Sequence, residues 1–202
     1  MKRAYYFVWP LLFGSLWGLS EVTAGEALYN LDVFRASVWL SVWAFFLLAT
    51  ARGLTNTPGT STAIGGIAAL FRLANTSPYF CHLLGIFLLG VAFDVAATIF
   101  LRKERPFSLQ NSLAGVTGAF AGHALFALTV TYIIRYEFWA SAGLPKVLDH
   151  IFINGSLVAL ASLILVPLGY WIGRSGEVIF RRSPRWALTG ALLTTIAIWI
   201  LG

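Results

Sequence analysis

Cys81 and three histidines are the residues of this sequence best suited to nucleophilic or metal chemistry. Because Cys81 is the only cysteine, an intramolecular disulfide is excluded. Its side chain either packs as a small buried group or acts as a thiolate that binds a metal or attacks an electrophile. A protonated His82 would favour the thiolate, although adjacent residues on a helix do not face each other. The residue types leave packing and reactivity both open.

The other two histidines, His123 and His150, lack the spacing of a helical metal-binding pair or of a Cys/His zinc site. His123 falls in the middle of an apolar segment, on the same face as Gly115 and Ala119, which favours an interhelical hydrogen bond over metal ligation. His150 follows Asp149 at the start of another apolar segment, where it could line an external pocket. These positions predict polar contacts and a pocket wall.

Acidic residues occur in or near the apolar segments. Asp94 lies inside one, where an unpaired charge costs several kcal/mol, so we expect an Arg from a neighbouring helix end or a polar helix face to satisfy it. Glu21 and Glu26 are interpreted as interfacial residues.

The sequence contains no Walker loop, Ser/His/Asp signature or carboxylate pair with glycosidase spacing. ATP hydrolysis and the usual hydrolytic reactions therefore have no support, and energy for any transport would come from a partner.

The composition predicts that lipid surrounds the chain. It is 58% hydrophobic and 11% charged, with a mean hydropathy of +0.79, whereas soluble chains are about half apolar and a quarter charged. Since roughly 20 apolar residues span the hydrocarbon as a helix, the 202 residues allow about six or seven passes. The apolar segments are 4–28, 36–51, 60–73, 82–101, 110–134, 150–173 and 186–201. We predict an all-α integral membrane protein, a bundle of six to seven transmembrane helices in a single domain over residues 1–202.

The basic residues predict the orientation of this bundle. The first segment resembles a signal peptide, but we interpret it as a transmembrane helix that is retained. With seven passes and a cytoplasmic N-terminus, most Lys and Arg residues lie inside, as the positive-inside rule requires. The inner residues are Lys2, Arg3, Arg52, Arg102, Lys103, Arg105, Arg174, Arg181, Arg182 and Arg185, and the outer ones are Arg35, Arg72, Arg135 and Lys146. Topology thus explains the net charge of +6 without nucleic acid as a partner.

Small residues recur at helical spacing in two segments. Ala114, Gly118 and Gly122 are four residues apart, and Gly14 and Gly18 repeat the pattern near the N-terminus. Such faces let another helix approach closely. We expect packing within the bundle, with a docking surface for a partner membrane protein as the alternative.

The small size, the basic charge, the glycine-bearing first helix and an external loop after the third segment resemble an S-component of the energy-coupling-factor vitamin transporters. The lone cysteine in Tyr79-Phe80-Cys81-His82 is similar to that of the solitary vitamin B12 S-components, the BtuM family. That fold has six helices, so the segment 186–201 would be additional. The resemblance places the chain in the inner (cytoplasmic) membrane and makes an energy-coupling module, docked on the small-residue faces, a possible partner.

The resemblance implies that the chain binds cobalamin from the outer side, with Cys81 in the outer loop as axial cobalt ligand, and moves it inward. Cys81 would then also assist removal of cyanide from cyanocobalamin. A polarizable thiolate suits cobalt, and a flat corrin with amide fringes calls for aromatic walls and hydrogen-bonding groups. The residues expected near the ligand are Cys81, Tyr79, Phe80, His82, Tyr29, Asn30, Tyr132, Phe138, Trp139 and His150.

Three alternatives remain open from the sequence. The chain could be an S-component for another vitamin, with Cys81 merely packing. It could be a membrane thiol enzyme that uses Cys81 as nucleophile and His82 or His150 as base. It could also be a structural subunit of a larger membrane complex, which would bind no small ligand.

Overall fold

The computed structural model describes residues 2–73, 80–101, 106–182 and 184–201. This part of the chain is helical, with no strand, as the sequence predicts. The α-helices are α1 (Lys2–Asn30), α2 (Ala36–Thr55), α3 (Thr60–Leu73), α4 (Phe80–Phe100), α5 (Leu109–Leu128), α6 (Glu137–Leu148), α7 (Gly155–Arg182) and α8 (Pro184–Leu201), and the π-helical segments are η1 (Thr129–Ile133) and η2 (Asp149–Asn154).

Four helical stretches in the described residues are long and apolar enough to cross a membrane. They are Ala36–Thr55, Phe80–Phe100, Leu109–Ile133 and Glu137–Glu177. Two shorter apolar helices cover Thr60–Leu73 and Leu188–Ile200. Large apolar side chains also remain exposed on the outside of the bundle, including Ile164 at 70% and Ile200 at 77%. The chain is therefore a helical protein with the features of membrane embedding.

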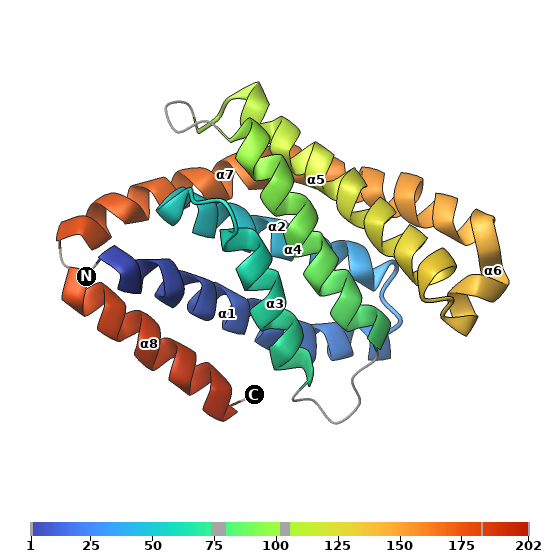
Figure 1. The fold of residues 1–202 in the computed structure, drawn as a ribbon, viewed down its shortest axis with the longest axis horizontal. Coiled ribbons are helices and arrows are strands. Elements are labelled where there is room, and N and C mark those ends of the chain that lie inside the picture. Colours follow the sequence, from blue (N-terminus) through green and yellow to red (C-terminus); the bar gives the residue numbers. More distant parts are fainter. Residues whose placement is uncertain (1, 74–79, 102–105, 183, 202) are drawn as a thin grey trace.

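The helices run back and forth along one bundle (Figure 1). The C-terminal ends of α2, α4 and α7 point toward the same end as the N-terminus of α1. The core lies between α2, α4, α5 and α7, where Phe45 and Phe93 meet edge to face with ring centroids 5.0 Å apart. On the other side α1 packs against α3 and α8. Because four stretches of the described residues are long and apolar enough to cross a membrane, the seven passes expected from the sequence stay a prediction.

The ends of two helices follow from their local sequence. Asn56 ends α2 in the left-handed conformation, with φ 42°, and donates its backbone N–H to the Arg52 carbonyl at 2.7 Å, a conformation that Asn tolerates. Ser108 caps α5 by accepting a hydrogen bond from the Asn111 backbone N–H at 3.3 Å. Gly59, with φ 87°, completes the turn before α3.

The fold corrects two expectations. Helix α4 begins at Phe80, so Cys81 lies in the first turn of a helix and not in a loop. The apolar segment predicted at 150–173 does not begin as an isolated helix at residue 150, because α6 and η2 precede α7. Gly143 bends α6 with φ 60°, and Pro145 follows the bend. The helix α6 was not expected from the sequence, because Gly and Pro usually interrupt a helical pattern.

Candidate functional site

A pocket lies between α1, α2, α4, α5 and η2, toward the end of the bundle at which α2 and α4 begin. The empty space in it amounts to about 600 Å³, its open mouth included. Its polar lining consists of Glu21, Ser37, Ser41, Cys81, His82, His123 and His150. Trp17 and Phe126 provide aromatic walls. Apolar surfaces with a few polar groups are typical of small-molecule sites.

Cys81 belongs both to this pocket and to a packed apolar cluster. Its side chain is 9% exposed and carries a free thiol. Behind the pocket it packs in a cluster with Val130, Trp139 and Val147. The packing expected of a buried cysteine is therefore observed, and the same thiol also lies in the wall of a cavity.

His123 and His150 meet in the pocket, with ring centroids 4.8 Å apart. Phe126 and Trp139 surround His150, with centroids at 5.3 and 5.2 Å. His123 Nδ1 lies 2.8 Å from the carbonyl oxygen of Ala119, one turn earlier in α5. The expected interhelical hydrogen bond of His123 is thus wrong, since the ring bonds to its own helix and leaves its other edge for the pocket.

Arg35 and Asp149 hold His150 in place through Asn154. Arg35, just before α2, forms two hydrogen bonds of 3.0 Å with the Asp149 carboxylate, which raises the pKa of Arg35. The same guanidinium donates to Asn154 Oδ1. Asn154 Nδ2 in turn lies 3.1 Å from His150 Nδ1. The expectation that His150 lines a pocket is confirmed.

Glu21 is half-buried and faces the pocket, which corrects its interpretation as an interfacial residue. Its carboxylate accepts a hydrogen bond of 3.0 Å from Trp17 Nε1. Arg72 donates to the Glu21 backbone carbonyl and is itself buried, at 5% exposed. The i, i+4 spacing of Trp17 and Glu21 was the sequence signal that could have placed both on one pocket-facing stripe.

Of the ten residues expected at the ligand, Cys81, His82 and His150 line the pocket. Trp139 is buried behind it, packed on Phe126 with ring centroids 5.1 Å apart. Tyr79 falls outside the described residues, and Tyr29 lies in α1 with a side chain that is not described. The side chains that the structure places on the surface and away from the pocket are Asn30, Phe80, Tyr132 and Phe138.

Helical geometry explains why some residues expected at the ligand lie on the surface instead. Phe80 is 58% exposed while Cys81 is buried, because neighbours on a helix project about 100° apart. Phe138 and Trp139 differ in the same way, and the Lys146 ammonium sits 3.4 Å from the Phe138 ring centroid at the surface. Proximity in sequence to a pocket residue therefore did not bring these side chains to the ligand site.

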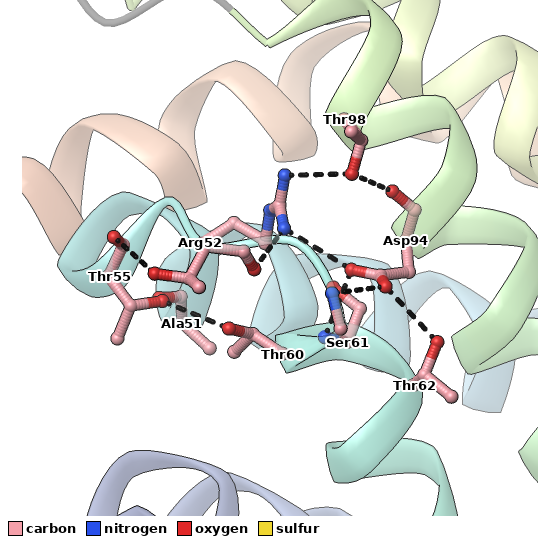
Figure 2. Close-up of polar contacts among 10 residues, drawn as sticks. Ala51, Arg52, Thr55, Thr60, Ser61, Thr62, Asp94 and Thr98 are labelled. Carbon is pink, nitrogen blue, oxygen red and sulfur yellow. Dashed lines mark hydrogen bonds and ion pairs between the residues drawn. The ribbon is translucent and has the colours of Figure 1, made fainter. Parts of the chain in front are cut away.

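Asp94 lies in a separate polar cluster, where α2 ends and α3 begins (Figure 2). Its Oδ1 is 3.2 Å from Arg52 Nη1, and its oxygens accept hydrogen bonds from the backbone N–H groups of Gly59 and Ser61 and from the Thr62 hydroxyl. The carboxylate thus caps the first turn of α3. The expected Arg partner from a helix end is confirmed. Arg52 is only 1% exposed, so it is not a surface residue of the cytoplasmic face, to which the sorting of Lys and Arg by membrane side had assigned it.

The small-residue faces are filled by the chain's own helices. A Cβ atom on Gly14 or Gly18 would lie 2.6 Å or less from side-chain atoms of α3, and one on Gly118 or Gly122 would meet Phe45 or Leu89 within 2.9 Å. The packing expectation is therefore confirmed. The chain's own helices occupy these faces, so docking of an energy-coupling module there has no support in the structure and stays a prediction.

The described residues contain no group of three or more His, Cys, Asp or Glu side chains arranged to hold a metal ion. A metal that arrives inside an organic ligand needs only a single protein ligand, which one thiol or imidazole can supply.

Comparison of this chain with protein-family models, curated proteins and solved structures finds no match.

Proposed function

We propose that this chain is a membrane uptake protein that binds cobalamin in the pocket beside Cys81 and passes it inward. The observation that carries the proposal is a free thiol in the wall of a pocket that also presents three imidazoles. The pocket lies at the end of the bundle that would face outward if the N-terminus is cytoplasmic. An inner membrane location with that orientation belongs to the proposal.

The proposed cobalt chemistry requires only one ligand from the protein. Cobalt in a corrin exchanges its axial ligands, and a thiolate is a soft ligand that suits it. In cyanocobalamin the Cys81 sulfur would lose its proton and form the Co–S bond, and cyanide would leave with the electron pair of the Co–C bond and take up that proton as hydrogen cyanide. The oxidation state of cobalt does not change in this exchange, so no reductant is required.

The size of the pocket restricts how the ligand binds. A corrin with its side chains exceeds the space between the helices. We therefore place the ring across the mouth, with an axial face toward Cys81 and part of its polar fringe inside. Trp17 and Phe126 offer flat apolar walls to the part that enters.

The test is a visible absorption spectrum of detergent-purified protein after incubation with cyanocobalamin and desalting. We expect the wild type to retain a corrin with a shifted spectrum, because the sulfur replaces an axial ligand. Cys81→Ser should lose the shift or the corrin, whereas Thr117→Val, an exposed position on α5, should behave as wild type. Absence of a retained chromophore from the wild type would refute cobalamin binding.

A second candidate is uptake of a solute smaller than cobalamin, with Cys81 as a packing residue. The observations in its favour are the limited space between the pocket helices and the packing of Cys81 in an apolar cluster. On this alternative Cys81→Ser leaves ligand binding intact.

A further inference from the structure

The hydrogen bonds around His150 determine which ring nitrogen carries its proton. A guanidinium only donates, so the Asn154 atom that Arg35 contacts is the amide oxygen. The amide nitrogen of Asn154 then lies 3.1 Å from His150 Nδ1 and donates to it. His150 Nδ1 is therefore the acceptor nitrogen, and the ring proton is on Nε2.

The orientation of the Asn154 side-chain amide is fixed by its neighbours. Turning the Asn154 amide over would place its NH₂ group against the Arg35 guanidinium, donor against donor. Asp149 fixes that guanidinium from the other side with two hydrogen bonds of 3.0 Å, and Asn154 is buried at 7% exposed. The chain Asp149–Arg35–Asn154–His150 thus holds one tautomer.

His123 has the opposite tautomer. The Ala119 carbonyl oxygen only accepts, so His123 Nδ1, at 2.8 Å from it, must carry the proton. The Nε2 atom of neutral His123 is consequently a lone-pair acceptor. Within the described residues neither Nε2 atom has a protein hydrogen-bond partner, and both rings line the pocket.

We propose that His150 and His123 form a donor–acceptor pair that recognises a carboxamide of the ligand. His150 Nε2–H donates to the amide oxygen, and the amide N–H donates to His123 Nε2. With ring centroids 4.8 Å apart, one small group can contact both. A carboxylate would meet the His123 lone pair without a donor of its own, so the pair selects amide over acid.

This inference rests on the proposed function, because it takes the pocket as the ligand site, and it gives the amide fringe of a corrin a specific partner. It extends equally to smaller amides. The pair is independent of Cys81, so its failure and the failure of cobalamin binding can be told apart.

The first experiment reads the tautomers without a ligand, by ¹⁵N NMR of the ring nitrogens in histidine-labelled protein. Three histidines give few signals, and His82→Gln removes one set. We expect a protonated Nε2 on His150 and a protonated Nδ1 on His123. Asn154→Asp should move the His150 proton to Nδ1, because a carboxylate at that position accepts from both Arg35 and the ring. The same tautomer on both histidines, or no change in Asn154→Asp, would overturn the inference.

The second experiment measures binding of cyanocobalamin, and of nicotinamide against nicotinate as small probes. The Asn154→Asp and His123→Phe proteins should each bind cyanocobalamin and nicotinamide about five- to tenfold more weakly than the wild type. This is the loss expected for one hydrogen bond. Thr117→Val serves as the control. In the wild type, nicotinamide should shift the ring signals of His123 and His150, and nicotinate should not.

The outcomes separate the two proposals. If the wild type retains no cyanocobalamin but nicotinamide shifts both ring signals, amide recognition stands and cobalamin binding falls. If cyanocobalamin binds equally well to the wild type and to an Asn154→Asp protein whose His150 tautomer is inverted, amide recognition is overturned. It is also overturned if neither amide probe moves the ring signals.

Discussion

At the scale of single residues, the Asp94 carboxylate ties three helices together. It lies on α4, its charge is balanced by Arg52 from the end of α2, and it accepts the backbone N–H groups of Gly59 and Ser61 at the start of α3. Thr98 and the Thr57 carbonyl complete the contacts of Arg52. A buried carboxylate with this many donors is well satisfied, whereas a buried Arg without its carboxylate is not.

We predict that Asp94→Ala and Arg52→Met each lower the free energy of unfolding by about 3–5 kcal/mol, because each leaves charged or polar groups buried without a partner. The double variant should lose less than the sum of the two, since no unpaired charge remains. The measurement is unfolding by a denaturing detergent, followed by circular dichroism. Glu137→Ala, an exposed position, is the control. Additive losses would show that the two side chains are not coupled.

At the scale of helices, α2 and α7 approach so closely that their backbones touch. A Cβ atom on Gly173 would lie 2.1 Å from the Thr50 carbonyl oxygen, and one on Gly53 would lie 2.4 Å from that of Tyr170. Glycine is required at both positions because no side chain fits between the helices. This contact fixes the distance between α7 and α2, one of the helices that line the pocket.

We predict that Gly173→Ala destabilises the protein by about 1–3 kcal/mol or more, because the added methyl group pushes α2 and α7 apart. Gly66→Ala in α3 is the matched control. A Cβ there meets nothing within 4 Å, so the substitution should be neutral or add about 0.5–1 kcal/mol through helix propensity. The same unfolding measurement compares them, and equal effects of the two substitutions would disprove close packing of α2 on α7.

At the scale of the whole molecule, the bundle has two ends. The loop between α1 and α2, which holds Leu31 at 75% exposed, lies at the end where the pocket is found. The turn between α2 and α3, which holds the exposed Pro58, lies at the other end. The orientation proposed from the basic residues places the first of these on the outer side of the membrane and the second on the cytoplasmic side.

We predict that a membrane-impermeant maleimide labels Leu31→Cys in intact cells but labels Pro58→Cys only after the membrane is opened. Both substitutions are made in the Cys81→Ser background, so that each protein has one thiol. Gel-shift detection of the label is sufficient. Labelling of Pro58→Cys alone in intact cells would reverse the orientation and place the mouth of the pocket on the cytoplasmic side.

The sequence alone determined the helical membrane character, the approximate segments and the need for a partner at Asp94. Each of these follows from composition, from hydrophobic length or from the cost of an isolated charge in lipid. The packing role of the small residues followed from their spacing. These properties depend on local pattern, which is why they could be predicted without coordinates.

Only the tertiary structure decided which side chains share the pocket. Glu21, His123 and His150 come from α1, α5 and η2, and no sequence spacing relates them. The rotation of α4 about its axis put Cys81 in the pocket and left its neighbour Phe80 outside. A prediction that both residues lie in a loop does not specify which of them faces the pocket. The tautomer of His150 likewise depends on Arg35, which is distant in sequence and reaches Asn154 only because the helices pack together.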